Sequence, residues 1–292
     1  MPTLTSRNGI RPYGPGYPTL LINDQLNIHE QAPRILRELL EGKIDLMVDI
    51  AQWGYRMGMD TVGILIDHPD LNDVELMPRI AYAIHQQVGC PIGLDSRNPV
   101  ALAATLEQMR PYKCVVFTIN GDQEVLDGML PVIKKYGAVI AAMPMGHSGL
   151  GVPMTVEGRL AEARYIMEVC LGYGIPKDDI VIDAICMAAS TLLPNAFQVS
   201  LATVRAVHEQ LGLAVQLGVS NAGSGMPDPT SIDLACLLGA MASGVDATFM
   251  NPATLTLRES VLAMDFLTER DAVGKRYLQN WRSFYGKKPD RP

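Results

Sequence analysis

Eight short apolar runs recur along the chain, and none shows the strict alternation of a strand with one exposed face. They are Thr19–Ile22, Thr61–Ile66, Ile92–Leu94, Cys114–Ile119, Ala138–Ala142, Ile180–Ile182, Ala214–Val219 and Ala247–Met250. Unbroken apolar runs of this length are typical of strands that are buried on both faces, as in a parallel sheet. The pattern therefore predicts eight parallel strands.

Stretches with helical spacing separate several of these runs. The predicted helices span residues 44–57, 100–109, 123–136 and 156–171. In the first, Ile44, Met47, Val48 and Ala51 fall on one helical face. Strands that alternate with helices over 292 residues favour a single closed (β/α)8 barrel. A doubly wound open sheet is the alternative, although it usually has fewer strands and a clear switch point.

The chain shows no linker or low-complexity segment that would divide it, so residues 1–292 are predicted to form one domain. Residues 1–17 are rich in Gly and Pro and are expected to be an irregular N-terminal extension. Residues 257–292 are expected to form a final helix and a tail after the last strand.

Composition narrows the classes of function. The net charge of −7 argues against nucleic acid or an anionic membrane surface as the main partner, since both require a basic patch. No apolar run approaches the roughly 18–20 residues that span a bilayer. Five cysteines without a CxxC spacing, and a start without an apolar leader, predict a cytoplasmic protein. No pair of histidines has metal-ligand spacing, so no metal is expected to bind this chain.

Polar side chains follow the apolar runs, and at four of the runs a carboxylate or an amide that comes at once or within two residues is a candidate for ligand binding. These residues are Asp95, Asn120, Asp183 and Asn221. The carboxyl ends of parallel strands meet at one end of a barrel, where such proteins bind their ligands. A pocket of acceptors and amides at this end suits a flat heterocycle that is rich in hydrogen-bond donors.

Each of these residues also has a purely structural interpretation. Asp95 precedes Asn98 and Pro99, which are typical of the start of a helix, so it can serve as a cap. Asn221 lies in a loop of small residues that also fits an ordinary turn. Asp183 is harder to explain in this way, because apolar residues flank it and a buried carboxylate needs donors.

Further polar residues are candidates for the rim of the pocket. Asp67 and His147 lie just beyond predicted strand ends, and glycines close to His147 suggest a mobile loop. Ser220 and Ser224 belong to the same small-residue loop as Asn221. These four residues are predicted to border the site.

The same residues resemble the methyltetrahydrofolate:corrinoid protein methyltransferases, which are pterin-binding barrels related to dihydropteroate synthase. The resemblance runs from about Leu20 to Ala263. Its anchors are Gly93–Asn98, Ile119–Asn120, Gly174–Asp183 and Leu217–Asn221.

The resemblance implies a role for each strand-end residue. Asp95, Asn120 and Asp183 would hold the pterin, whose guanidine-like edge can donate two parallel hydrogen bonds to a carboxylate. Asn221 would be the catalytic residue and would contact N5 of the folate, helping that nitrogen to leave without itself ionising. The implied reaction moves a methyl group between N5 of tetrahydrofolate and the cobalt of a corrinoid (cobalamin) that a partner protein carries. A homodimer is also implied.

The chain departs from the family pattern at the second strand. The family commonly has Asp-x-Asn at the end of this strand, whereas here the polar residues come later, at Asp67 and His68. The direction of transfer is left open, since the same chemistry can charge a corrinoid protein or unload one after anaerobic demethylation of a methoxyaromatic compound or a methylated amine.

Two alternatives are retained. Dihydropteroate synthase shares the barrel and the pterin pocket, but its pyrophosphate leaving group calls for cations near the pocket. Asn221 stands where that enzyme has a lysine, and the segment Phe249–Ala253 lacks a basic pair. A non-catalytic barrel that only binds folate is the other alternative.

Overall fold

The computed structural model describes residues 1–28 and 32–284. Eight parallel strands close into a barrel, in which the last strand pairs with the first. They are β3 (Leu20–Asn23), β4 (Thr61–Leu65), β5 (Ile92–Asp95), β6 (Val115–Asn120), β7 (Val139–Met143), β8 (Ile180–Asp183), β9 (Ala214–Gly218) and β10 (Ala247–Met250). The predicted (β/α)8 barrel is confirmed.

Several strands extend one residue beyond the predicted apolar run and include the polar residue that follows. Asp95 pairs with Leu65 of the neighbouring strand, and Asp183 pairs with Gln216. A polar side chain at a strand end does not interrupt the backbone ladder, so the ladder continues until the chain turns away.

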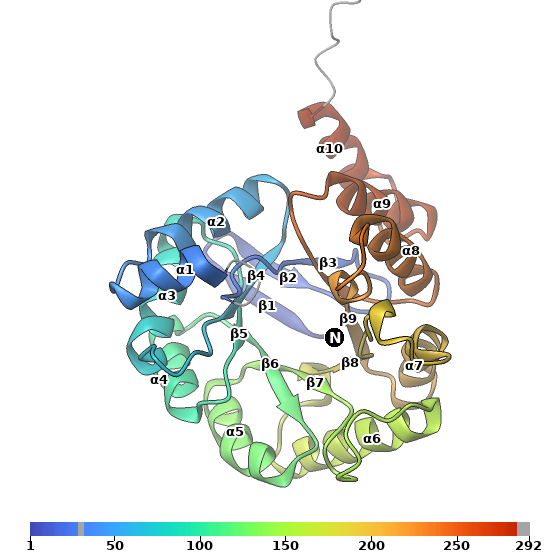
Figure 1. Cartoon of the computed structure of the whole chain (residues 1–292), viewed down its shortest axis with the longest axis horizontal. Helices are drawn as coiled ribbons and strands as arrows, with labels where there is room; N and C mark the ends of the chain where they lie inside the picture. The colour runs from blue at the N-terminus through green and yellow to red at the C-terminus, as the bar shows by residue number, and fades with distance from the viewer. Residues whose placement is uncertain (29–31, 285–292) are drawn as a thin grey trace, which may run out of the picture.

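Helices surround the barrel, as Figure 1 shows in a view along it. They are α1 (Ala32–Leu40), α2 (Asp45–Arg56), α3 (Asp73–Gln87), α4 (Pro99–Met109), α5 (Gln123–Tyr136), α6 (Val156–Gly172), α7 (Ala196–Leu211), α8 (Pro229–Ala242), α9 (Leu255–Leu267) and α10 (Lys275–Phe284). The four predicted helices correspond to α2, α4, α5 and α6, with ends that differ by at most one residue. The apolar core lies between the helices and the sheet.

The cap of α4 decides one question that the sequence left open. The Asn98 side chain accepts hydrogen bonds from the backbone N–H groups of Val100 and Ala101, and Pro99 occupies the first helical turn. Asn98 therefore caps this helix, and the predicted capping role of Asp95 is not needed there.

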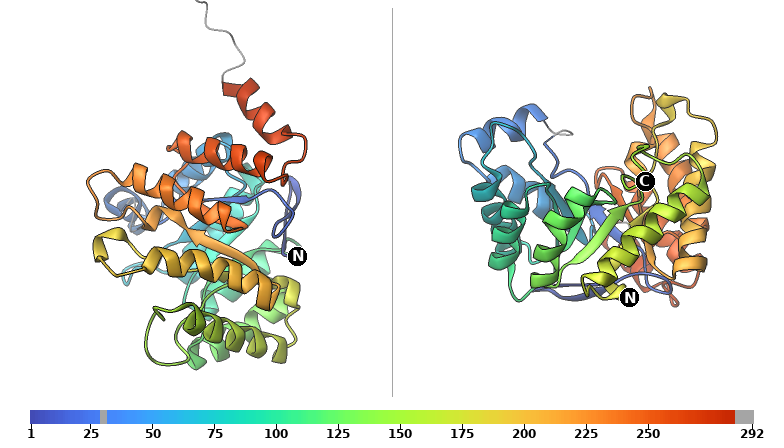
Figure 2. Two further views of the ribbon diagram at one scale, coloured as in Figure 1. Left: turned by 90° about the vertical axis from the view of Figure 1, so that its right-hand side faces the viewer. Right: turned by 90° about the horizontal axis from the view of Figure 1, so that it is seen from below.

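The N-terminal extension is not irregular, and this prediction is wrong. Strands β1 (Thr3–Ser6) and β2 (Gly9–Pro12) form an antiparallel hairpin, which lies across one end of the barrel in the right-hand view of Figure 2. Leu4 and Tyr13 are buried there against inward-facing residues of the barrel strands. The two residues between these four-residue strands are Arg7 and Asn8, and the Asn8-Gly9 pair at the end of this turn was the signal in the sequence.

The C-terminal region also differs from the expected single helix. Two helices, α9 and α10, follow the last strand. The Asp271 carboxylate accepts hydrogen bonds from the backbone N–H groups of Lys275, Arg276 and Tyr277, and so starts the second helix. Residues 285–292 of the predicted tail lie outside the described residues.

Candidate pterin-binding site

A cavity of about 430 Å3 opens at the carboxyl ends of the barrel strands. Its size is within the range of small-molecule and cofactor pockets. The residues that line it are Asp24, Asn27, Leu65, Asp67, Asp95, Ser96, Arg97, Phe117, Met143, Asp183, Gln216, Gly218, Ser220, Asn221 and Phe249. Among the described residues that line it, Arg97 alone carries a positive charge, so the cavity is mainly one of acceptors and amides.

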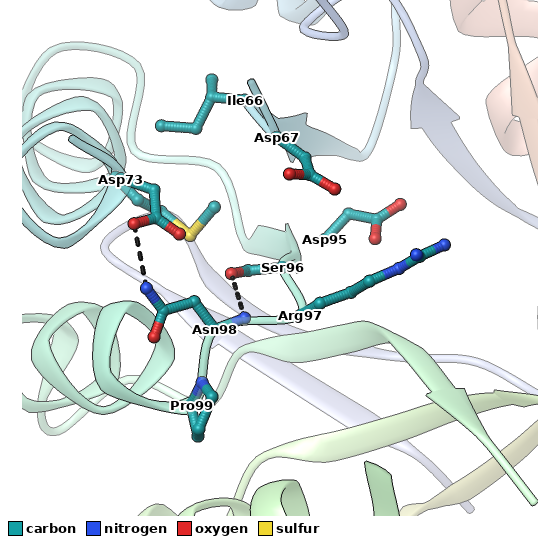
Figure 3. Close-up of a pocket in the computed structure, with 9 residues that line it drawn as sticks. Ile66, Asp67, Asp73, Asp95, Ser96, Arg97, Asn98 and Pro99 are labelled. Carbon is teal, nitrogen blue, oxygen red and sulfur yellow. Dashed lines mark hydrogen bonds between the residues drawn. The ribbon is translucent and has the colours of Figure 1, made fainter. Parts of the chain in front are cut away.

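A second hollow adjoins this cavity on the side of β4 and β5 (Figure 3). The two share Asp67, Asp95, Ser96 and Arg97. Figure 3 shows the carboxylates of Asp67 and Asp95 pointing toward the same space, with the Arg97 side chain running alongside. The shared residues make one continuous polar wall.

Two aromatic rings lie at the bottom of the cavity. The rings of Phe117 and Phe249 meet edge to face with their centroids 4.8 Å apart. Phe117 fits because residue 93 is glycine: a Cβ atom there would lie 2.2 Å from the Phe117 ring. Gly93 therefore permits an apolar surface against which a flat ring can pack.

Asp183 ends β8 and presents a buried carboxylate at the cavity wall. Its Oδ1 atom accepts the Ile185 N–H at 2.8 Å, and its Oδ2 atom accepts an Nε2–H of Gln216 at 3.0 Å. Burial raises the pKa of Asp183, and the nearby Asp95 raises it further, whereas these hydrogen bonds and the charge of Arg159 work to lower it. No ion pair to Asp183 occurs among the described residues. Neutral donors thus leave this carboxylate able to accept more hydrogen bonds.

Asn221 lies in the short 3-10 turn Val219–Asn221 that follows β9, the strand that pairs with β8. The Ser220 hydroxyl donates to Asp24 Oδ2 at 2.7 Å, and the Gly223 N–H donates to Asp233 Oδ1 at 2.7 Å. A Cβ atom at Gly218 would lie 3.0 Å from Asn221 Nδ2, so glycine leaves room for the amide. The turn is tied down on both sides of Asn221, which fixes where the amide can point.

The structure thus brings Asp67, Asp95, Asp183, Ser220 and Asn221 to one cavity. The other three predicted residues, Asn120, His147 and Ser224, do not line this cavity.

Asn120 is absent from the lining, and its Oδ1 atom accepts the Asp122 N–H at 2.9 Å. The register of β6 against β7 shifts between Val116 and Ile119, and β6 presents Phe117 to the cavity instead. The pterin-holding role of Asn120 stays a prediction.

His147 and Ser224 lie farther out. The His147 ring stacks on Tyr165 with centroids 3.5 Å apart, and its backbone N–H donates to the buried Glu162 carboxylate. Ser224 lines a neighbouring hollow that also contacts Ser220 and Asn221. Their proposed place at the rim stays a prediction.

Sequence reasoning missed other residues of the cavity. Asp24 and Asn27 follow the first barrel strand, and the same strand-end rule applied to Leu20–Asn23 would have found Asp24. Gln216 lies within β9, where no strand-end rule reaches. Its contact with Asp183 depends on the pairing of two strands and has no signature in either segment alone.

Neither a metal-binding cluster nor a membrane span is found in the part of the chain that the structure describes. No group of three or more His, Cys, Asp or Glu side chains in this part of the chain is arranged to hold a metal ion. None of the helices that the structure describes is long and apolar enough to cross a membrane.

Residues 68–251 match the family described as pterin binding enzymes, and the chain belongs to this family. It is 22% identical over 201 residues to the methylcorrinoid:tetrahydrofolate methyltransferase of Eubacterium limosum, covering 68% of this chain and 73% of that one. It is 24% identical over 235 residues to the methionine synthase of Mycobacterium leprae, covering 77% of this chain but 19% of that one.

Among solved structures, the DHPS of Yersinia pestis superposes with a TM-score of 0.69 at 15% identity, covering 91% of this chain and 99% of that one. The 7,8-dihydropteroate synthase of Vibrio fischeri gives 0.66 at 18% identity, with coverage of 90% and 98%. At these identities the structural likeness establishes the fold alone. The chain is therefore a pterin-binding barrel, similar in sequence to the methyltransferase of Eubacterium limosum and in fold to the dihydropteroate synthases, and the family that the resemblance implied is confirmed.

Proposed function

We propose that this protein transfers a methyl group between N5 of tetrahydrofolate and the cobalt of a corrinoid held by a partner protein. The observation that carries the proposal is the single cavity that Asp95, Asp183 and Asn221 all line. The proposal extends what the name of the Eubacterium limosum relative says of that protein to this chain.

The carboxylates suit one end of the pterin. Its 2-amino and N3–H groups form a pair of donors that one ionised carboxylate can accept side by side. Asp183 is suited to this, because its hydrogen bonds to Ile185 and Gln216 hold the group in place and leave lone pairs unused. The rings of Phe117 and Phe249 would pack against the heterocycle.

Asn221 suits the reacting end. When the methyl group leaves N5, the electron pair of the C–N bond stays on nitrogen, and N5 must carry a proton to be a good leaving group. The Asn221 amide can accept from protonated N5 and donate to the free amine afterwards, so it serves both directions of transfer. The reduced corrinoid, when its protein docks, supplies the cobalt nucleophile that accepts the methyl group.

Dihydropteroate synthase activity is the second candidate, because the structural neighbours carry that name. Its pyrophosphate leaving group needs positive charge. Arg97 is the one cationic side chain among the described residues of the lining, and it shares its wall with Asp67 and Asp95. The charge of the cavity therefore favours methyl transfer.

We also propose that the partners are a corrinoid protein and a second copy of the chain, in the cytoplasm. Helix α10 exposes Tyr277, Leu278 and Trp281, an apolar surface of the kind that a second subunit covers. The five cysteines are free thiols, as is usual in a reducing compartment.

The test offers the protein two substrate pairs and follows the products by chromatography. With 5-methyltetrahydrofolate and cob(I)alamin under anoxic conditions, we expect tetrahydrofolate and methylcobalamin. With a hydroxymethyl-dihydropterin pyrophosphate and p-aminobenzoate, we expect no product. Dihydropteroate formation would instead establish the second candidate, and folate binding without either product would leave a folate-binding barrel.

A further inference from the structure

The residue that holds Asp183 has an unusual backbone. Ile185 has a φ of 53°, in the left-handed region that β-branched residues rarely adopt. This conformation directs its N–H back onto Asp183 Oδ1 at 2.8 Å. A strained residue next to a binding group persists only where the surroundings impose it.

Arg159 of α6 imposes this turn. Its Nη1 atom donates to the backbone oxygens of Ala184 at 2.5 Å and Ile185 at 3.0 Å, and Nε donates to Pro153 O at 2.9 Å. The Ser200 hydroxyl of α7 also donates to Ile185 O, at 2.6 Å, and accepts from Arg159 at 3.1 Å. The two carbonyl groups that follow Asp183 are thus held by one guanidinium.

The burial of Arg159 is not explained by an ion pair. Its side chain is fully buried, and no carboxylate within the described ranges lies close enough to form a salt bridge with it. Its Nη2 atom has no hydrogen-bond partner among the described residues. A buried charge without a paired carboxylate is costly to the fold. A charge retained at such a cost points to a role in the site.

We propose that Arg159 is a positioning residue for pterin binding, which fixes the strained turn Ala184–Ile185 and through it the Asp183 carboxylate. This inference rests on the proposed function, in which Asp183 accepts the donor edge of the pterin. Arg159 does not line the cavity, so it acts through the turn and through its charge.

The positive charge of Arg159 predicts a measurable effect on the pH dependence of pterin binding. Burial raises the pKa of Asp183, and the Arg159 guanidinium counteracts this increase. Among the described residues, Asp95 from β5 raises the pKa of Asp183, the uncharged Gln216 from β9 donates to it, and the Cys186 thiol lies close enough for Asp183 to raise the pKa of that thiol. An ionised Asp183 accepts both pterin donors, so binding should fail as the pH falls through the Asp183 pKa. Without the guanidinium, that failure should occur at a higher pH.

The experiment measures the affinity of the purified protein for 5-methyltetrahydrofolate at a series of pH values. Arg159→Gln removes both the charge and the fork of donors, and we expect about 10- to 100-fold weaker binding, the scale of a lost charged hydrogen bond. The pH below which the variant no longer binds, which we call the acid limit, should move to a higher value. Arg159→Lys keeps the charge but loses the branched set of N–H donors of the guanidinium group. This variant should therefore bind 5-methyltetrahydrofolate more weakly, with an unchanged acid limit.

A second substitution tests the strain. Gly adopts a φ of 53° without the steric penalty that Ile185 meets. In the Arg159→Lys background, Ile185→Gly should therefore restore much of the lost affinity, because the turn no longer needs to be forced. A merely structural role for Arg159 would not predict this rescue.

The outcomes separate the two proposals. If the wild type does not bind methyltetrahydrofolate, the proposed function fails. If the wild type binds, and both Arg159 variants bind equally well with the same acid limit, the positioning role is overturned. Weaker binding without the pH shift and without the glycine rescue also overturns it. If the Arg159 variants do not fold, Ser200→Ala carries the test: several-fold weaker binding supports the role, and unchanged binding contradicts it.

Discussion

The two ends of the barrel use buried carboxylates in opposite ways. At the end that the β1–β2 hairpin covers, which we call the closed end, Asp60 accepts hydrogen bonds from Arg11 at 3.1 Å, Arg276 at 3.0 Å and the Leu21 N–H at 2.9 Å. At the other end, which we call the open end because the cavity lies there, the donors to Asp183 that the structure describes are uncharged: the Ile185 N–H and the Gln216 amide. Although burial works to raise it, the two guanidinium groups bring the pKa of Asp60 below its usual value, whereas burial leaves that of Asp183 raised.

The pairing of carboxylates with cations extends along the closed end, although burial leaves the pKa of Asp265 raised despite its partners. Asp246 pairs with Arg270 and His208, and Asp265 pairs with Arg276 and accepts from Thr19. The hairpin β1–β2 lies across this end of the barrel. Carboxylates that are given cationic partners within the chain hold the closed end together. Those given neutral donors, at the open end, are suited to a ligand that brings its own donors.

Asp60→Ala should produce the largest effect, and on stability alone. Loss of the carboxylate leaves Arg11 and Arg276 without their partner, which costs about 3 kcal/mol for a largely buried pair. Chemical denaturation measures this as a lower free energy of unfolding. Binding of methyltetrahydrofolate by the folded variant should not change, and a large loss of affinity would break the division between the two ends.

Asn221→Ala should act only on transfer. We expect the rate of methyl transfer to fall by about 10- to 1,000-fold, the scale of one hydrogen bond made in the transition state. The free energy of unfolding should stay close to that of the wild type, because the turn is also tied by Ser220 and Gly223. Stopped-flow absorbance measures the rate. Transfer at the wild-type rate would remove Asn221 from the catalytic role.

Asp183→Asn should stabilise the fold in a pH-dependent way. The pKa of Asp183 is raised in the folded state, so this group favours folding most when it is protonated and loses that contribution as the pH rises through the folded pKa. The variant should therefore be more stable than the wild type at neutral pH, and the advantage should vanish in acid. Thermal unfolding across pH measures the difference. A destabilised variant at neutral pH would show that Asp183 serves the fold.

Ser220→Ala should have the smallest effect. It removes the hydrogen bond to Asp24 and so loosens the turn that carries Asn221. We expect the activation free energy of methyl transfer to rise by about 1 kcal/mol, which lowers the rate roughly fivefold. Steady-state kinetics with methyltetrahydrofolate measures it, with Ser224→Ala as a control on the same loop. Equal effects from the two substitutions would show that the hydrogen bond does not position Asn221.

Much of the fold followed from the sequence because both faces of the barrel strands are buried, which leaves short apolar runs without strict alternation. The hairpin was missed because four-residue strands carry too little alternation to register. In the site, strand-end logic found Asp95, Asp183 and Asn221, since it depends only on where each apolar run stops. The same logic expected Asn120 at the cavity, whereas β6 lines it with Phe117, a residue inside the strand that a strand-end rule does not reach.

Arg159 shows the limit of sequence reasoning in another way. A single arginine on a helix carries no signature, and its contacts to Ala184 and Ile185 arise only when α6 packs beside β8. The strain at Ile185 is equally invisible, because the residue type there is the opposite of what a left-handed turn favours.

A titration of matched Asp→Asn variants with 5-methyltetrahydrofolate tests the central claim most directly. Asp183→Asn loses the charge that accepts the pterin edge, and we expect its affinity to fall by at least about tenfold. Asp60→Asn makes the same chemical change at the closed end, and we expect wild-type affinity. Equal affinities in the two variants and the wild type, or the loss of binding in Asp60→Asn alone, would contradict the account.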